Sequence, residues 1–276
     1  MGRNLHKYYY RDYFGEQPEE IKDSDNRQDR GRTVSLDWNN IKSKENASIL
    51  KKRNARLTGA GLLNVIENPT DTKDTFQLKI IYPGLVTGIG INHEATIEGE
   101  FKLGVHFDWT HGMPVVYGSS VKGVLRDAFE NGYVDASLIA HANSRADISE
   151  TDKVPDWVGD SAMNKDLVND IFKGEGKSIY GRDIFFDAVL TCADSKNRIL
   201  VADSITPHTE GPLKDPTPIT FLKIAPGCTI EFRFKLTDSM INDKMFTASQ
   251  KKTLFREILT TVGIGAKTNV GYGQLK

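Results

Sequence analysis

The spacing of apolar residues predicts two amphipathic helices in this chain. Between residues 119 and 131, apolar side chains recur at intervals of three and four, which places them on one helical stripe. Residues 248–262 repeat this pattern near the C-terminus. The stripes consist of Val121, Val124, Leu125, Ala128 and Phe129 in the first helix, and of Leu254, Phe255, Ile258, Leu259 and Val262 in the second. We expect Ser119 or Ser120 to cap the first helix and Gly263 to end the second.

Shorter runs rich in β-branched residues predict strands between and around these helices. Residues 75–82 show the clearest alternation of apolar and polar positions. The other expected elements are strands at 94–108, 183–191, 199–203, 219–224, 228–236 and 270–275, and weaker helices at 39–56 and 161–172. Residues 205–218 contain four prolines and predict an irregular excursion. Because the strands come in runs and do not alternate with helices, the pattern indicates the α+β class.

Charge is unevenly distributed along a chain whose net charge is only −1. Residues 41–56 hold six basic residues and one acid, whereas residues 16–30 hold six acids and three bases. A local basic stripe can bind a polyanion even when the total charge cancels. A solvated helix surface explains the same stripe, and the sequence leaves both interpretations open.

Composition narrows the cellular setting. The 276 residues include two cysteines, Cys192 and Cys228, which fits a reducing compartment and no disulfide framework. The N-terminal residues lack the apolar core of a signal peptide, and no apolar run approaches the length of a membrane span. We therefore expect a cytoplasmic protein with no membrane partner.

The first segment with candidate chemistry runs from Pro114 to Arg126 and leads into the first amphipathic helix. The free backbone N–H groups of a helix start and the helix dipole favour an anion there. Lys122 and Arg126 share one helix face, where they repel mildly unless an anionic partner or Glu130 relieves them. A capped surface helix accounts for the same residues, so both interpretations stay open.

The second segment, Gly263–Gly273, holds four glycines within eleven residues. Such a cluster, beside Lys267 and Thr268, suggests bare backbone that a phosphate can approach closely. A P-loop would need a glycine where Ala266 stands, and a dinucleotide site would need a following helix. A surface for extended phosphodiester, with Tyr272 available to stack on a base, fits better. The alternative is a tight connection between helix and strand.

The histidines and carboxylates suggest no catalytic or metal centre. His106, Asp108 and His111 are close in sequence, but a metal site needs three or four convergent ligands. We expect these residues to be hydrogen-bonded structural groups, and we expect no metal or other cofactor. His208, in the proline-rich excursion, fits a hydrogen-bonding or phosphate-contacting role better than that of a lone general base. No nucleophile elbow points to hydrolysis.

Several segments resemble one protein family, and they do so in the family's order. Tyr117–Arg126 resembles the PGSSLKGALR element of the RAMP proteins of CRISPR systems, with Tyr117 in place of its proline. Gly263–Gly273 resembles their C-terminal glycine-rich signature, and Tyr180–Ala188 resembles the strand that lies between them. Further segments resemble the sixth subunit of Cmr (type III-B) effector complexes: Asp203–His208, Pro218–Leu222 and Ala225–Gly227.

The resemblance implies a fold and a role. The fold would be a modified ferredoxin-like, RRM-type domain over residues 61–276, with residues 1–60 as a variable N-terminal extension packed on it. The role would be that of a non-catalytic RNA-binding subunit that grips the 3′ region of the crRNA and caps the backbone filament in antiviral defence. Its partners would be crRNA, target RNA and the backbone, small and other terminal RAMP subunits of the Cmr complex.

The alternative within the family is an endoribonuclease that processes precursor crRNA, with His208 or His111 as general base. For the binding role, the RNA-contacting candidates come from the two motifs and the proline-rich excursion. They are Ser119, Ser120, Lys122, Arg126, His208, Gly263, Gly265, Ala266, Lys267, Thr268, Gly271 and Tyr272. Contacts of this kind to the RNA backbone would make binding largely independent of base sequence and sensitive to salt.

Overall fold

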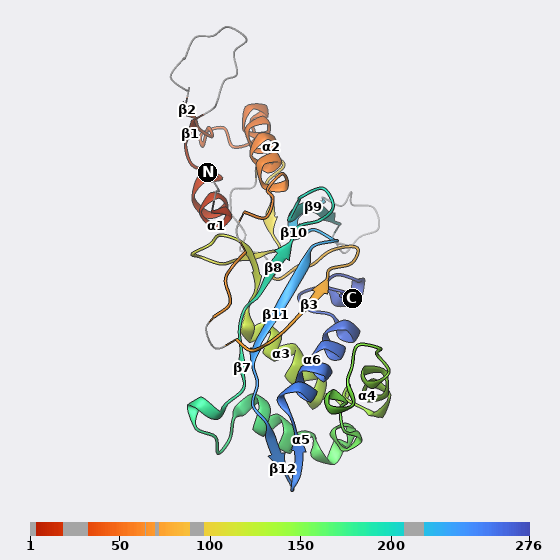
Figure 1. Cartoon of the computed structure of the whole chain (residues 1–276). Helices are drawn as coiled ribbons and strands as arrows, with labels where there is room; N and C mark the ends of the chain where they lie inside the picture. The colour runs from red at the N-terminus through yellow and green to blue at the C-terminus, as the bar shows by residue number, and fades with distance from the viewer. Residues whose placement is uncertain (1–3, 19–32, 64, 70–71, 89–96, 207–217) are drawn as a thin grey trace.

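An antiparallel sheet forms the centre of the molecule (Figure 1). The computed structural model describes residues 4–18, 33–63, 65–69, 72–88, 97–206 and 218–276. Strand β11 (Thr229–Lys235) lies between β3 (Asp74–Lys79) and β8 (Ala188–Cys192), antiparallel to both. The sheet continues beyond β8 through two further strands, β6 (Pro114–Val116) and β5 (His106–Phe107), while β7 (Ile184–Phe185) pairs with the end of β11.

The order of the central strands identifies the fold. The C-terminal segment pairs with β3 through an antiparallel bridge between Ile80 and Leu275. With the inserted shorter elements and the second sheet set aside, β3 is followed along the chain by helix α3 (Gly118–Glu130), then by β8 and β11, then by helix α6 (Ala248–Val262) and the C-terminal segment. This succession is the β-α-β-β-α-β arrangement of ferredoxin-like folds. The predicted α+β, ferredoxin-like architecture is therefore confirmed.

Helix α6 packs on the central sheet through an aromatic side chain. Phe255 of α6 lies 5.7 Å from Phe234 of β11 and 5.9 Å from Phe185 of β7, measured between ring centroids. A capping box between Thr247 and Gln250 starts α6, which ends before Gly263 as predicted. Each fully buried side chain of this size contributes about 1.5–3 kcal/mol of hydrophobic stabilisation. No helix in the described ranges is both long and apolar enough to cross a bilayer.

A second, smaller sheet lies beside the upper end of the central one in Figure 1. Its middle strand is β10 (Ile219–Ile224), flanked by the antiparallel β9 (Leu200–Ile205) and the parallel β4 (Lys102–Leu103). Residues 225–228 lead directly from β10 into β11, and Leu85 forms a bridge with Ile224. The two sheets therefore meet just beyond the end of β3.

The described N-terminal residues join the same hydrophobic core. The first turn, α1 (Leu5–Lys7), continues into the π-helical segment Tyr8–Asp12, and α2 (Lys44–Thr58) packs nearby. The Tyr9 hydroxyl donates to the Phe101 carbonyl oxygen at 2.7 Å. Arg53, one of the six bases of the predicted basic stripe, is buried and donates to the carbonyl oxygens of Tyr13, Gly15 and Val34. It is therefore a structural tie and not part of a polyanion-binding surface.

The remaining elements are small and were mostly missed from sequence. They include β1 (Gln17–Pro18), β2 (Thr33–Val34), α4 (Ala136–Asn143), α5 (Asn164–Leu167) and the hairpin of β12 (Ser239–Ile241) and β13 (Lys244–Phe246). The predicted helix over residues 161–172 exists as α5 between a 3₁₀ turn (Ser161–Met163) and a π-helical segment (Val168–Lys173). Other 3₁₀ turns cover Glu150–Asp152, Asp156–Gly159, Ile179–Gly181 and Thr268–Val270.

Two predicted strands are wrong in extent. Of the strand expected at 94–108, the described residues form only β4 and β5. The last strand, expected at 270–275, is replaced by the 3₁₀ turn Thr268–Val270 and the single bridge at Leu275. The reason is local, because Gly271 and Gly273 have φ values of 94° and 72°, which interrupt an extended strand.

A fully buried ion pair connects α6 to the sheet. Lys251 Nζ lies 2.6 Å from Asp183 Oδ2 and 2.7 Å from the Thr237 carbonyl oxygen, and neither charged side chain is exposed. Asp183 also accepts the Thr237 backbone N–H at 2.6 Å. Both charges are thus desolvated but hydrogen-bonded, and removing one would leave the other uncompensated.

We predict that Lys251→Met lowers the free energy of unfolding by about 3–5 kcal/mol, because it leaves the Asp183 carboxylate buried without its cation. Urea denaturation monitored by circular dichroism measures this. The matched control is Lys252→Met, one residue along α6 and partly exposed, which should change stability by less than about 0.5 kcal/mol. Equal effects of the two variants would contradict the prediction.

Candidate nucleic-acid interface

Helix α3 begins at Gly118, directly after the extended residue Tyr117. Ser119 and Ser120 lie inside its first turn, so the expectation that one of them caps the helix is wrong. The Gly118 N–H donates instead to Asp187 Oδ1 at 2.7 Å, which places a carboxylate of this chain at the positive end of the helix. This partner could not be predicted from sequence, because Asp187 comes from a loop after β7.

Gly118 is required by packing. A Cβ atom built there would lie 2.2 Å from the Phe185 carbonyl oxygen, closer than any side chain tolerates. On the same side of the helix, Lys122 Nζ lies 5.8 Å from the Phe185 ring centroid. The glycine of the first motif therefore lets α3 lie close to β7, and its presence does not require a ligand.

Arg126 and Lys122 lie on one flank of α3, as the four-residue spacing predicted. Arg126 is exposed, and its Nε lies 3.4 Å from Glu130 Oε2, an exposed i,i+4 pair worth a few tenths of a kcal/mol. Glu130 thus relieves part of the repulsion between the two cations, as considered from sequence. Both side chains are accessible enough to exchange these partners for phosphate.

The glycine-rich loop Gly263–Gly273 folds against β3 and the residues that follow it. The Gly273 N–H donates to the Gly84 carbonyl oxygen at 2.8 Å, and the Ala266 N–H donates to the Val86 carbonyl oxygen at 2.7 Å. Added Cβ atoms would lie 2.3 Å from the Val86 oxygen at Gly265 and 1.8 Å from the Ile264 oxygen at Gly273. Much of the glycine content therefore serves close packing of this chain on itself, the alternative left open above.

Tyr272 is almost buried, which corrects the expectation that its ring is available to stack on a base. Only 8% of it is exposed, and its hydroxyl donates to Asp203 Oδ2 at 2.7 Å. Lys223 pairs with the same carboxylate, and its Nζ lies 5.2 Å from the Tyr272 ring centroid. Burial and then the hydrogen bond to Asp203 raise the pKa of Tyr272 to about 12. The Tyr272 side chain therefore links the glycine-rich loop to the second sheet.

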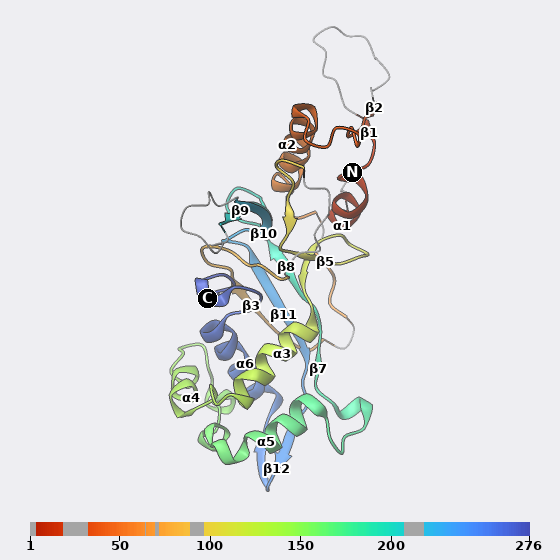
Figure 2. The ribbon, with the colours of Figure 1, turned by 180° about the vertical axis from the view of Figure 1, so that it is seen from behind.

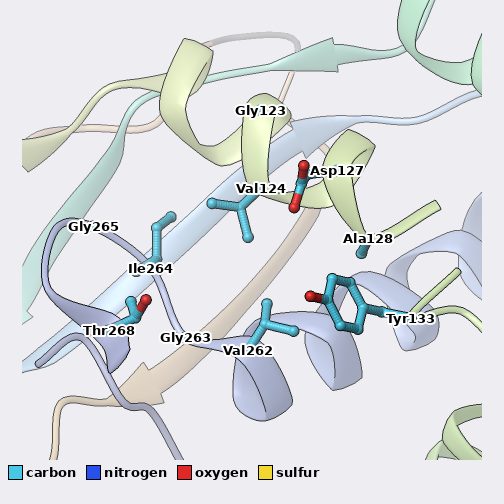
Figure 3. Close-up of a pocket in the computed structure, with 10 residues that line it drawn as sticks. All are labelled: Gly123, Val124, Asp127, Ala128, Tyr133, Val262, Gly263, Ile264, Gly265 and Thr268. Atoms are coloured by element: carbon cyan, nitrogen blue, oxygen red, sulfur yellow. The ribbon is translucent and has the colours of Figure 1, made fainter. Parts of the chain in front are cut away.

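The two motifs meet across one pocket, with a volume of about 510 Å³ (Figure 3). From α3 it is lined by Gly123, Val124, Asp127 and Ala128, and from the other side by Tyr133, Val262, Gly263, Ile264, Gly265 and Thr268. The proposed RNA-contacting residues are thus divided. Gly263, Gly265 and Thr268 line the pocket, whereas Lys122 and Arg126 lie on the opposite flank of α3. Asp127 disfavours a phosphate inside the pocket itself.

Gly123 lies on the exposed ridge of α3 between the pocket and the cationic flank. A Cβ atom added there would have no atom within 4 Å, so packing does not require a glycine. A glycine in a helix interior costs about 0.5–1 kcal/mol relative to alanine. Bare backbone at this point would allow close approach of another molecule over α3. Gly123 was not predicted as a site residue, although a glycine inside a helical pattern often has a packing or functional reason.

The lysine of the glycine-rich loop is exposed and adopts a left-handed backbone conformation, with φ of 62° at Lys267. Its carbonyl oxygen accepts the N–H groups of Val270 and Tyr272, which fixes the turn around it. Ala266 and Gly271 are partly exposed beside it. The loop therefore presents Lys267 to solvent on a well-defined backbone, although Gly263 and Gly273 at its two ends are buried.

The histidines of the sequence analysis form no shared centre. His106 stacks on Tyr117 at 4.6 Å, and burial lowers its pKa. His111 Nδ1 lies 2.9 Å from Asp108 Oδ1 at the rim of a 360 Å³ pocket that also includes Asp187. Among the described residues no three His, Cys, Asp or Glu side chains could hold a metal ion together. His208 lies outside the described residues.

Comparison with known proteins identifies the family. A family model of the RAMP superfamily matches residues 77–276. The chain belongs to the RAMP superfamily. The matched range contains both motifs and all elements from β4 to the glycine-rich loop. A search of curated proteins finds no match.

Two solved structures are similar to this chain. One chain of a cryo-EM structure of the type III-B Cmr-beta bound to cognate target RNA is 21% identical, with a TM-score of 0.48. The match covers 74% of this RAMP protein and 58% of that chain, so this chain spans less than two thirds of its length. The crystal structure of Cmr6 from Pyrococcus furiosus is 22% identical, with a TM-score of 0.34, covering 75% of this chain and 98% of that chain.

The glycines give a matched pair of variants. We predict that Gly123→Ala raises the free energy of unfolding by about 0.5–1 kcal/mol, because its site is open and helical. Gly273→Ala should lower it by more than about 1 kcal/mol, because its φ is positive and its Cβ would collide with the Ile264 oxygen. Chemical denaturation of both variants measures the difference, and a destabilised Gly123→Ala would contradict this assignment.

Proposed function

We propose that this RAMP protein is an RNA-binding subunit of a type III-B CRISPR effector. In this role it grips the 3′ region of the crRNA and caps the backbone filament in antiviral defence. The partners on this proposal are crRNA and target RNA, together with the backbone, small and other terminal RAMP subunits of a Cmr complex.

The observation that carries the proposal is the meeting of the two motifs. Gly118–Arg126 and Gly263–Gly273 are far apart in sequence, yet both border the pocket or the α3 ridge beside it. Membership of the RAMP superfamily and the resemblance of Asp203–His208 to sixth subunits support the more specific assignment.

The geometry narrows the proposed path of the RNA. Phosphates would contact Lys122 and Arg126 on one flank of α3 and Lys267 on the loop, since Asp127 repels them from the pocket. The backbone would cross α3 at Gly123, where no side chain stands in the way. Ser119, Ser120, Gly263, Gly265, Ala266, Thr268 and Gly271 stay predicted contacts to the sugar–phosphate chain, and Tyr272 would act by holding the loop.

We predict that Arg126→Ala combined with Lys267→Ala weakens binding of single-stranded RNA at least about tenfold. The slope of log affinity against log salt should also fall by about 0.7 for each lost phosphate contact. Fluorescence anisotropy with a labelled repeat-derived RNA over a range of salt concentrations measures both quantities.

The matched control removes two exposed lysines elsewhere, Lys196 in the turn before β9 and Lys244 in the β12–β13 hairpin. It carries the same change of net charge, so a general electrostatic effect would appear in both double variants. Unchanged affinity and slope in the Arg126 and Lys267 variant would reject the proposed contact surface.

We also propose that the subunit does not cleave RNA, and the Asp108–His111 pair allows a direct test. Like the His141–Glu257 pair at 2.6 Å, it has the arrangement of a general base, because the carboxylate orients the imidazole at 2.9 Å. We predict that purified protein leaves precursor repeat RNA intact in EDTA. Specific cleavage that His111→Ala or His208→Ala abolishes would establish the endoribonuclease instead.

A further inference from the structure

Five aromatic side chains lie in two groups on the side of the molecule where the N-terminus lies. The Trp109 ring centroid is 4.3 Å from that of His6, which is 4.6 Å from that of Tyr10. At the other end, Tyr117 stacks on His106 at 4.6 Å, with 20° between the ring planes. His106 and Trp109 are only three residues apart in the chain, which keeps the two groups of rings near each other. We call this set the aromatic row.

The N-terminal residues and the loop after β5 build the row together. Asn4 Nδ2 donates to the carbonyl oxygens of Trp109 and Thr110, each at 3.2 Å. Leu5 is buried, and its N–H donates to the Gly112 carbonyl oxygen at 3.1 Å. Figure 2 shows α1 lying beside the loop after β5. Hydrogen bonds of Asn4 and of the backbone therefore hold the two segments together, and they leave the faces of the rings unused.

The row is unusually accessible for so much aromatic surface. Trp109 is 74% exposed, and the other four rings are only partly buried. An isolated exposed apolar side chain needs no explanation, but a contiguous patch held in place marks a surface that contacts something. Because aromatic rings carry few rotatable bonds, ordering them in advance lowers the entropy cost of binding.

Basic side chains identify the kind of partner. Lys7 and Arg11 follow His6 and Tyr10 by one residue each along the same helical segment, and both are exposed. The acid that faces His6 is Asp108, which is held by the ring and the backbone N–H of His111. Burial lowers the pKa of His6 and of His106, which favours the uncharged form of both imidazoles. Flat uncharged rings can stack on nucleic-acid bases, and the cations beside them can contact the phosphates.

We propose that the aromatic row stacks the bases of single-stranded RNA, with Lys7 and Arg11 contacting its phosphates. The row ends at Tyr117, the residue directly before α3, so it is continuous with the RNA surface of the proposed function, on which this inference rests. The described N-terminal residues thereby gain a function, since they supply His6, Tyr10 and both cations. Stacking tolerates any base, so the row adds affinity without sequence preference.

The test compares His6→Ala combined with Trp109→Ala against the full-length unmodified chain. Two probes of about 12 residues are used, an oligoadenylate and an abasic ribose-phosphate chain of equal charge. We expect the double variant to bind oligoadenylate about ten- to 100-fold more weakly, because alanine substitution of one stacking residue costs about 1–3 kcal/mol per base. Affinity for the abasic probe should not change. Tyr180→Ala, which removes an 86% exposed ring elsewhere, is the matched control and should alter neither affinity.

Each other outcome has a definite meaning. Equal oligoadenylate affinity of variant and unmodified chain, with RNA binding intact, overturns the aromatic row and leaves the proposed function standing. If that variant then fails to join purified Cmr subunits, the row binds protein instead. Equal weakening for both probes also overturns stacking. Failure of the unmodified chain to bind any RNA overturns both the row and the proposed function.

A spectroscopic measurement on the ring itself complements the affinities. In a Trp38→Phe, Trp157→Phe background, Trp109 is the single tryptophan of the chain. Its fluorescence should be quenched by oligoadenylate and unaffected by the abasic probe, because only a stacked base contacts the indole face. No quenching at saturating oligoadenylate would reject the proposal even if the alanine variant failed to fold.

Discussion

The contact between the glycine-rich loop and residues 84–86 is the constraint on which the candidate interface depends. Two backbone hydrogen bonds, from Gly273 to Gly84 and from Ala266 to Val86, hold the loop against the chain just beyond β3. Their donors and acceptors can approach only because Gly265 and Gly273 lack side chains. The loop then bounds the pocket opposite α3 and presents Lys267 on a fixed backbone. The same contact ties the C-terminus to the first strand of the fold.

The fold could be predicted from sequence wherever periodicity was strong. The ends of helices α3 and α6 were predicted to within one residue. Each helix buries one face, so its apolar residues recur with the regular period of an α-helix. The short strands β4 to β7 and the hairpin β12–β13 have too few residues to show alternation. The terminal strand failed for a different reason, since Gly271 and Gly273 have positive φ values; the Gly271 N–H bonds within the local turn to Thr268, and the Gly273 N–H bonds to the distant Gly84.

The sequence motifs of the candidate site could be predicted, but the arrangement of their side chains in space could not. Sequence identified both motifs, but it could not show that Lys122 and Arg126 lie on the flank of α3 away from the pocket. It predicted that the Tyr272 ring is available to stack on a base, whereas Asp203 and Lys223, which are remote in sequence, contact this side chain and help to bury it. The aromatic row was also invisible, because His6 and Trp109 belong to segments that only tertiary packing brings together.

The carboxylate of Asp187 has a further consequence for selectivity. It occupies the start of α3 as a tethered ligand, so its effective concentration there is high, in the millimolar range or above for a short tether. A free phosphate ion at low concentration competes poorly with such an internal anion. A polyanion already held at neighbouring points has a comparably high local concentration and can displace it. On the proposed function, the helix start would thereby be screened against small anions while staying open to a chain of linked phosphates.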